Sequence, residues 1–592
     1  MLAPEVVYHG GRFYTLDPAQ PRVQALAVLH GRIVAAGSDE EVLRLADART
    51  RRVDLEGAVA LPGFHDAHCH ILLFGLSLVE VNLRHARSVA DVVAAVAERA
   101  RELGPGRWVR GGGYDQNRLA ERRHPTRWDL DPVSPENPVW LFHISGHMGV
   151  ANSAALKLAG VTRDTPDPPG GRIVRGEDGE PTGLLLETAQ DLVKRVLPPY
   201  TLAETKAALA AAGRQMAAEG ITAAQDAWAG WIAPEEFRAY QEASEEGLLP
   251  QRVWLMVDVE KLAVRDGRFD FGFGLHTGFG SDRLRLGAVK IFTDGSLIGR
   301  TAALSQPYAD PPDTSGFLVK SEETIREQVR LAHEGGWQVA LHAIGDRAIE
   351  ATLDAVEAVM GPDAAGFRPR VEHAGVLRPD LIERIRRLGA VVVTQPRFVF
   401  EFGEGYRAAL GEERIRLTFP LASLRGLHVA FSSDRPVTDG APLLGIAAAV
   451  LRRTASGTPY APEERISVEE AVRAYTLGAA YSAFAERELG SLEVGKCADF
   501  VVLDRDPLQV DPEEVARVHK AVDDIFAAAV ELGGTLSGEH GIGLLKKPYM
   551  SSAADAEALA IMRAIRSALD PNNIMNPGKM FPDETAFTSP AK

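Results

Sequence analysis

Leu61–His70, with the sequence LPGFHDAHCH, is an apolar run that ends in two histidines one residue apart. Side chains of an extended strand alternate between its two faces, so His68 and His70 should point to the same side. By the same rule, His65 and Cys69 should face away from that pair. Two imidazoles on one face can bind one divalent ion, although such a pair can also be only the polar end of a strand. A metal site therefore requires further ligands from elsewhere in the chain.

Further short apolar runs alternate with amphipathic stretches along the chain. The predicted strands cover residues 60–66, 222–227, 252–258, 285–292, 338–344, 370–374, 391–395 and 428–433. Alternating strands and helices predict an α/β fold, and eight such units predict a TIM-like (β/α)8 barrel. The gap between the first two strands is too long for one unit, so residues from about 80 to 200 are predicted to form an insertion over one barrel mouth.

Short β-rich runs lie before residue 58 and return near residues 490–505. Strands at both ends of a long middle section predict a small flanking β-sandwich domain, built from residues 1–58 and 485–516. The barrel would then take residues 59–484. A chain of 592 residues is long enough for several domains.

Side chains that can bind a metal stand at the ends of several predicted strands. They are His68 and His70 on the first, Lys290 on the fourth, His342 on the fifth, His373 on the sixth and Asp434 after the eighth. Barrel enzymes place catalytic groups at this end of their strands. Each residue also has a simpler interpretation: His342 and His373 could be core histidines, Lys290 could pair with Asp294, and Asp434 could cap a helix. Their combination is much harder to obtain by chance and predicts metal chemistry.

The same motifs resemble the amidohydrolase superfamily, and within it the YtcJ-like metal-dependent hydrolases. The resemblance extends to about residue 510 and rests on Pro62-Gly63-Phe64, Asp66-Ala67-His68-Cys69-His70, Val289-Lys290, Asp294-Gly295-Ser296-Leu297, His342-Ala343-Ile344-Gly345-Asp346, Glu372-His373 and Ser433-Asp434. In the predicted insertion, residues 146–147 and 152–156 are similar to that branch as well. Motifs of this kind are specific in combination.

The resemblance implies a role for each of these residues. The four strand-end histidines would hold one or two ions, and zinc suits them, although manganese or iron would also fit. Lys290 would carry a carbamate formed with carbon dioxide, which requires a neutral amine that burial favours. Asp434 would bind the metal, take a proton from the metal-bound water and return it to the leaving amine.

Candidates within the predicted insertion have two interpretations. His147 could polarise a substrate carbonyl as a catalytic residue, or it could only order the insertion, and His143 is a weaker candidate of the same kind. Four aromatic residues could line a pocket or form the insertion's own core. They are Trp108, Tyr114, Trp128 and Trp140.

The composition limits the partners of the protein. A net charge of -16 argues against nucleic acid. Two cysteines, Cys69 and Cys497, cannot form a disulfide framework and fit a reducing cytoplasm. The first residues do not resemble a signal peptide, and no apolar stretch reaches the roughly 20 residues of a membrane span. The expected partner is a small-molecule amide-type substrate, with a homodimer left open and no membrane.

Residues 517–592 have a different character, predicted to be mostly helical. Residues 518–526, 537–543 and 576–579 resemble the C-terminal end of FAD-linked oxidases of the glycolate oxidase and D-lactate dehydrogenase type. That resemblance implies that Glu539 and His540 would lie by a flavin. About 75 residues cannot build the flavin-binding fold, so we expect no FAD and no oxidase activity. A gene fusion or artificial junction near residue 517 would also remove the last strand of the flanking sheet and leave its edge unpaired.

The sequence therefore predicts a cytoplasmic metal-dependent amidohydrolase. It would cleave a non-peptide carbon–nitrogen bond, of a linear or cyclic amide, by attack of a metal-bound hydroxide. Two alternatives remain open: an FAD-linked 2-hydroxy acid oxidoreductase fragment, and a fusion protein whose catalysis is impaired.

Overall fold

A computed structural model of the chain describes residues 3–84, 86–143, 148–272 and 274–511. The largest sheet in these residues has eight strands, and every neighbouring pair of strands is parallel. The strands, in spatial order, are β23 (His428–Phe431), β22 (Val391–Thr394), β21 (Arg370–His373), β20 (Val339–Ala343), β19 (Leu284–Phe292), β16 (Arg252–Asp258), β15 (Ile221–Ala229) and β8 (Phe64–Cys69). This sheet confirms the predicted barrel.

The first and last strands of the barrel are joined at their C-terminal ends. The backbone N–H of Asp434 donates to the carbonyl of His68 at 2.8 Å, and the N–H of His70 donates to the carbonyl of Arg435 at 2.8 Å. These two bonds nearly close the sheet into a barrel. They also fix the two segments that carry three of the predicted ligands against each other.

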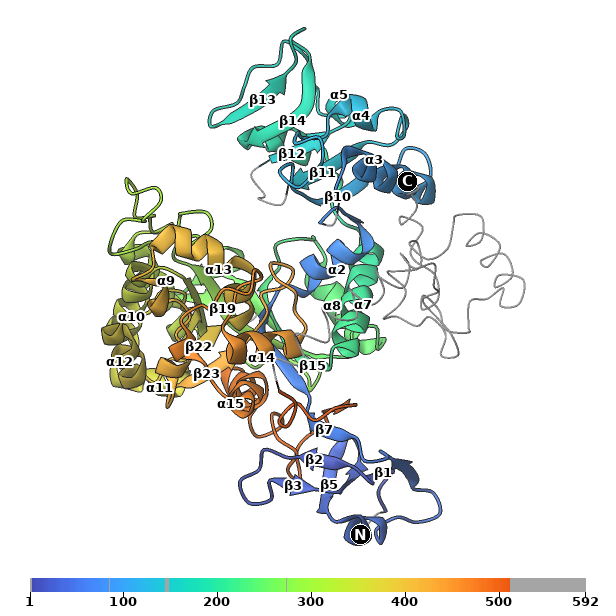
Figure 1. Ribbon diagram of the computed structural model, residues 1–592, viewed down its shortest axis with the longest axis vertical. Coiled ribbons are helices and arrows are strands. Elements are labelled where there is room, and N and C mark those ends of the chain that lie inside the picture. Colours follow the sequence, from blue (N-terminus) through green and yellow to red (C-terminus); the bar gives the residue numbers. More distant parts are fainter. Residues whose placement is uncertain (1–2, 85, 144–147, 273, 512–592) are drawn as a thin grey trace, which may run out of the picture. The chain divides into compact units, whose positions relative to one another are not determined.

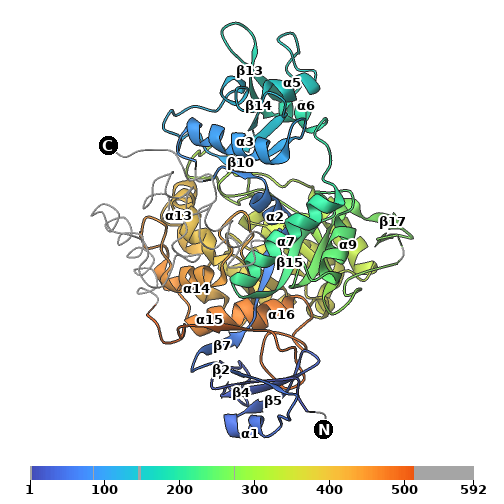
Figure 2. The ribbon, with the colours of Figure 1, turned by 90° about the vertical axis from the view of Figure 1, so that its right-hand side faces the viewer.

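Helices follow the strands and cover the outside of the barrel (Figures 1 and 2). They include α7 (Leu202–Ala218), α8 (Glu236–Glu245), α9 (Glu322–Glu334), α10 (Asp346–Met360), α12 (Pro379–Leu388), α13 (Pro396–Leu410), α14 (Pro442–Leu451) and α15 (Val468–Arg473). In α9, Ser321 caps the N-terminus by accepting a hydrogen bond from the N–H of Thr324. The helix buries Ile325 and Val329, four residues apart, in the same core cluster as strand residue Val339.

Two four-stranded sheets flank the barrel within the same compact unit (Figure 1). One consists of β5 (Arg32–Gly37), β4 (Ala25–Leu29), β1 (Val6–His9) and β6 (Arg51–Asp54), and the other of β24 (Phe500–Leu503), β7 (Val59–Pro62), β2 (Arg12–Tyr14) and β3 (Arg22–Val23). β24 pairs antiparallel with β7, so segments more than 400 residues apart share one sheet. Phe13 and Val23 of the second sheet and Leu26 and Ile33 of the first belong to one hydrophobic cluster.

The predicted first barrel strand, residues 60–66, is wrong in its bounds. The chain changes sheets at Gly63: β7 pairs with β24 and β2, and only β8 enters the barrel. The N–H of Gly63 donates to the carbonyl of Asp499 at 2.8 Å, and a Cβ at this position would lie 2.2 Å from Oγ1 of Thr222. A side chain would therefore clash where the two sheets meet, which explains why glycine stands there.

Most of the chain between β8 and β15, Ser77–Pro199, belongs to a second compact unit. It contains a six-stranded sheet made of β13 (Gly171–Arg175), β14 (Pro181–Glu187), β12 (Met148–Ala151), β11 (Val139–His143), β10 (Val109–Tyr114) and β9 (Val81–Asn82), together with α3 (Val89–Leu103) and α5 (Ser153–Leu158). Tyr114 and Trp140 are buried in its core clusters, and Trp108 packs against one of them, whereas Trp128 is 45% exposed. The placement of this insertion over a barrel mouth stays a prediction.

Two further expectations concern the edge of the small sheet and the tail. β24 is an outermost strand of its sheet in the part of the chain that the structure describes. The predicted tail, residues 517–592, lies outside the described residues, as does His147. In the described parts of the chain, every helix is too short or too polar to cross a membrane.

Candidate metal centre

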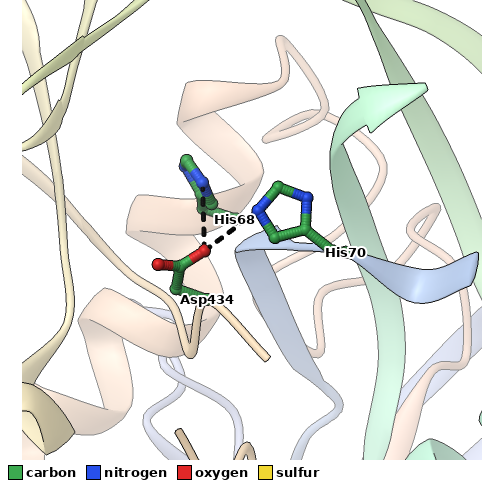
Figure 3. A group of neighbouring side chains, drawn as sticks. All are labelled: His68, His70 and Asp434. Carbon is green, nitrogen blue, oxygen red and sulfur yellow. Dashed lines mark ion pairs between the residues drawn. The ribbon is translucent and has the colours of Figure 1, made fainter. Parts of the chain in front are cut away.

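Three of the predicted ligands converge at the end of the barrel where β8 and β23 finish. Donor atoms of His68, His70 and Asp434 all lie within 4.8 Å of one another. Oδ1 of Asp434 lies 3.1 Å from Nε2 of His70 and 3.5 Å from Nε2 of His68 (Figure 3). His68 is buried, and the side chains of His70 and Asp434 are only 15% and 10% exposed. These two nitrogens and one oxygen face one small volume.

The other three predicted residues join this group. Nζ of Lys290 lies 3.3 Å from Nε2 of His68. The ring centroid of His373 lies 4.8 Å from that of His68 and 4.6 Å from that of His342. The barrel therefore brings together six side chains that are spread over more than 360 residues, as their positions at strand ends predict.

The far side of the His68 ring is bonded to a buried carboxylate. Nδ1–H of His68 donates to Oε2 of Glu372, which fixes the tautomer and leaves the Nε2 lone pair directed at Lys290 and Asp434. Nε and Nη2 of Arg370 donate to the two carboxylate oxygens of Glu372 at 2.7 and 3.2 Å. Arg370 and Glu372 are both buried, so the pair holds an ionised carboxylate behind the imidazole.

The rings of His373 and His342 are oriented in the same manner. Nδ1–H of His373 donates to Oε1 of Gln395 at 3.0 Å, and Nε2 of that amide donates to Oγ of Ser432 at 2.8 Å. Nε2–H of His342 donates to the carbonyl of Gly295 at 3.0 Å. Each imidazole therefore uses one nitrogen as a donor and keeps the other as a lone pair for coordination.

Two of the converging residues occupy backbone conformations that side chains seldom adopt. His373 has a φ of 70° and Asp434 a φ of 55°, both in the left-handed region. A residue held in such a region costs about 1–3 kcal/mol, and such strain gathers at functional sites. At Asp434 the neighbouring Ser433 N–H donates to the carboxylate of Asp66 at 3.0 Å, which helps to hold the turn.

The buried charges shift the pKa values in directions that suit cation binding. Burial lowers the pKa of Lys290 to about 8, against the opposing charges of Glu372 and Asp434. Burial alone would raise the pKa of Asp434, but its contacts with the surrounding histidines, first among them the hydrogen bond with His70, outweigh burial and bring the pKa below its ordinary value. Burial also holds the pKa values of His68 and His342 well below the ordinary value.

The donor set fits a divalent cation. His68, His342 and His373 each have one nitrogen hydrogen-bonded and a pKa that burial lowers, so they offer neutral imidazoles beside an ionised carboxylate, which are the protonation states that coordination requires. Buried groups of this kind would be difficult to explain as a packed core, because polar atoms in a core are paired with one another and not directed at one point.

The simpler interpretations of Lys290 and Asp434 find no support in their contacts. The carboxylate of Asp294 accepts hydrogen bonds from the backbone N–H groups of Ala303, Ile344 and Gly345, at 2.8–3.0 Å. Asp294 thus organises the loops after β19 and β20, while Lys290 faces His68. The carboxylate of Asp434 faces two imidazoles and not the end of a helix.

Two other histidines, His143 and His147, were predicted as possible parts of the site, and His65 was predicted to face away from it. Nε2 of His143 is bonded to Oε1 of Gln116 at 2.6 Å within the insertion unit, and its ring lies against Tyr114. His147 lies outside the described residues. The ring of His65 stacks on Trp254 at 5.2 Å, away from the ligand pair, as the strand alternation predicts.

Glu372, Arg370 and Gln395 were not predicted as parts of the site. A signal existed for two of them: Arg370 and Glu372 alternate along β21, so both point to one face of a buried strand. Charged residues in such a position need a partner. The sequence does not show that this partner is a histidine 304 positions away.

Comparison with known proteins defines the class to which this fold and site belong. Residues 51–532 match the Amidohydrolase family. The chain is 36% identical over 519 residues to "Putative amidohydrolase YtcJ" of Bacillus subtilis (strain 168). The aligned residues cover 86% of this chain and 96% of that protein. The chain is 32% identical over 505 residues to N-substituted formamide deformylase of Arthrobacter pascens, covering 83% and 92%. The chain belongs to the amidohydrolase family.

Solved structures agree with this assignment. The crystal structure of an uncharacterized metal-dependent hydrolase from Pyrococcus horikoshii OT3 superposes with a TM-score of 0.72 at 30% identity, covering 86% of this chain and 99% of that one. A second such hydrolase, from Pyrococcus furiosus, gives a TM-score of 0.71 at 32% identity, covering 85% and 100%. Together with the histidine and aspartate cluster, these similarities support a hydrolase that uses a divalent metal.

The tail matches a different family. Residues 507–580 match the C-terminal domain of FAD linked oxidases. Over 69 residues the chain is 49% identical to glycolate oxidase subunit GlcD of Bacillus subtilis (strain 168), which is 12% of this chain and 15% of that protein. The predicted resemblance of the tail is confirmed, and it spans a small part of that relative.

Proposed function

We propose that the protein hydrolyses a non-peptide carbon–nitrogen bond in a small amide-type substrate. The observation that carries the proposal is the convergence of His68, His70 and Asp434 next to Lys290. The relative from Arthrobacter pascens is named as a deformylase of N-substituted formamides, and that reaction breaks an amide bond. This name supports the substrate class proposed here.

The four histidines, Lys290 and Asp434 are proposed as the residues that hold the cation. We favour zinc because imidazole and carboxylate ligands suit it. A divalent ion held there would make a water molecule acidic enough to attack at neutral pH and would polarise the substrate carbonyl. Whether the site holds one ion or two depends on whether Lys290 carries the carbamate considered next.

Lys290 is proposed to carry a carbamate. Carbon dioxide adds only to a neutral amine, and a pKa of about 8 leaves an appreciable neutral fraction near pH 8. The carbamate would place two oxygens close to His68, where Nζ now lies 3.3 Å from Nε2. It would also turn a buried cation into an anion that complements the neutral imidazoles.

Asp434 is proposed as the proton-transfer residue. Its low pKa keeps the carboxylate ionised at neutral pH, so it can accept the proton of the attacking water. The same carboxyl can then donate that proton to the leaving nitrogen, which makes the amine a better leaving group. The short hydrogen bonds that tie residues 433–435 to β8 hold Asp434 in place for both steps.

The match of the tail to FAD linked oxidases motivates the rival function of a flavin oxidoreductase. We propose that the tail carries no flavin and that the barrel supplies the activity. An absorbance spectrum of the purified protein separates the two, because a bound flavin colours the protein yellow.

A panel of N-substituted formamides and cyclic amides tests the proposed function. Amine release should be measured with the protein as purified, after treatment with a chelator, and after zinc is added back. We expect activity that the chelator abolishes and zinc restores. Amine release that survives complete metal removal would contradict the proposal.

A further inference from the structure

Three aromatic rings form a continuous row that begins at the candidate metal centre. Phe292 is the last residue of β19, Trp228 lies near the end of β15, and Trp231 follows in the next loop. The rings of Trp228 and Phe292 meet edge to face at 5.2 Å between centroids. Trp231 stacks flat on Trp228 at 4.2 Å with an interplanar angle of 12°. We call Phe292, Trp228 and Trp231 the aromatic wall.

The inner end of the aromatic wall contacts the candidate metal centre. The ring centroid of Phe292 lies 5.2 Å from that of His342 and 4.9 Å from Nζ of Lys290. The ring of Trp228 lies 6.4 Å from that of His70. A substrate carbonyl positioned beside His70 and His342 would therefore have an apolar aromatic surface directly next to it.

The outer end of the aromatic wall is open to solvent. The side chain of Trp231 is 54% exposed, and Trp228 and Phe292 are only partly buried. Nε1–H of Trp228 donates to Oδ2 of Asp258 at 2.7 Å, which fixes the orientation of the middle ring. A wall that served only to pack the barrel would bury its outermost ring.

We infer that the aromatic wall binds a planar aromatic substituent of the substrate, so the substrate class is an amide that carries an aryl group. This inference rests on the proposed amide hydrolysis and adds the group that flanks the scissile bond. Flat rings stack well on indole faces and lose little conformational freedom when they bind. A flexible alkyl chain of similar size would gain less from the same surface.

The substitution Trp231→Ala tests this inference because it removes an exposed ring from the outer end of the wall. Two matched substrate pairs place the ring on either side of the amide: N-phenylformamide against N-propylformamide, and N-methylbenzamide against N-methylbutanamide. We expect kcat/KM for the aryl member of at least one pair to fall about tenfold, mainly through KM, with little change for its alkyl partner. Phe279→Ala, which removes an exposed ring that precedes β19 and so lies at the opposite end of that strand from Phe292, is the control and should change neither member.

A binding measurement separates a failure of this inference from a failure of the proposed function. The affinities of aniline and propylamine for the wild-type protein and for Trp231→Ala should be measured by titration calorimetry. If no amide is hydrolysed but aniline binds about tenfold more weakly to Trp231→Ala than to the wild-type protein, the inference about the aromatic wall is supported and the proposed function is contradicted. Hydrolysis or binding that changes equally for aryl and alkyl ligands, or for neither, would overturn the inference.

Discussion

The carboxylate of Glu372 accepts a hydrogen bond from Nδ1–H of His68, and both side chains are fully buried. This bond makes one imidazole tautomer the stable one and directs its Nε2 lone pair toward Lys290 and Asp434. The geometry of the candidate metal centre therefore depends on a residue that would not itself touch the ion. Partners of this kind raise the basicity of a histidine ligand and fix its ring.

Glu372→Gln removes the charge and keeps the shape of the side chain. We expect the affinity for zinc to fall about 10–100-fold, because the amide no longer enforces one tautomer of His68. Competition with a chelator of known affinity measures the change. Glu464→Gln is a matched control, since Glu464 is also buried and bonded to Ser423. Equal affinities in the wild-type protein and Glu372→Gln would show that the bond does not tune the site.

Asp434→Asn replaces the proposed proton acceptor with a neutral group of the same size. At a zinc concentration that saturates the site, kcat should fall about 10²–10⁴-fold, as expected when general acid–base catalysis is lost. Asp506→Asn serves as the control, because Asp506 is a buried aspartate that accepts a hydrogen bond from Tyr14 at 2.7 Å. Retention of wild-type kcat by Asp434→Asn would assign proton transfer to another group.

Carbon dioxide uptake by Lys290 should depend on pH. A pKa of about 8, lowered from 10.5 by burial, means that the neutral amine increases as pH rises through about 8. In bicarbonate buffer, the non-denatured mass should therefore show more bound carbon dioxide at pH 9 than at about pH 7, and Lys290→Met should show none. A mass that does not respond to bicarbonate at either pH would contradict the proposed carbamate.

The same pKa shift predicts a pH dependence of stability in the metal-free protein. The unfolded chain binds a proton at Lys290 up to a higher pH than the folded chain does, so folding should become more favourable as pH rises from about 8 to about 10.5. Chemical unfolding of the wild-type protein and of Lys290→Met across this range isolates the contribution. If the two proteins differ in their free energy of unfolding by the same amount at every pH, Lys290 has the same pKa in the folded and unfolded chains, and this prediction is wrong.

Removal of the tail should leave the hydrolase intact. A chain ending at Asp511 keeps every described residue of the barrel and the metal centre. We expect its kcat/KM to equal that of the full chain and neither protein to absorb as a flavin. A marked rise in activity on truncation would instead favour the fusion protein with impaired catalysis, and flavin absorbance in the full chain would favour the oxidoreductase.

The sequence predicts the barrel well because each strand is a short apolar run with its own boundary signals. The first strand shows the limit of this approach. Residues 59–69 are buried without interruption, and the contacts of Gly63 with Thr222 and Asp499 show where the chain leaves one sheet for another. Local composition carries no information about a contact over this sequence distance.

For the candidate site too, the sequence predicts one part and not the other: it predicts the ligands but not the residues behind them. The strand-end positions of His342, His373 and Asp434 predict that these residues meet, because the C-terminal ends of barrel strands share one face. The partners behind the ligands were not predictable in this manner. Whether Glu372 is bonded to His68 or to another side chain depends on the stagger of the strands around the barrel, which the sequence does not show.

The metal content of the purified protein tests the central claim most directly. Elemental analysis should find one or two divalent ions per chain in the wild-type protein and in His428→Ala, which alters an exposed histidine at the start of β23. His68→Ala and His70→Ala should lose most of this metal and fail to regain it in excess zinc. A wild-type protein that binds no divalent ion after incubation with zinc, or histidine variants that bind as much as the wild type, would contradict the account.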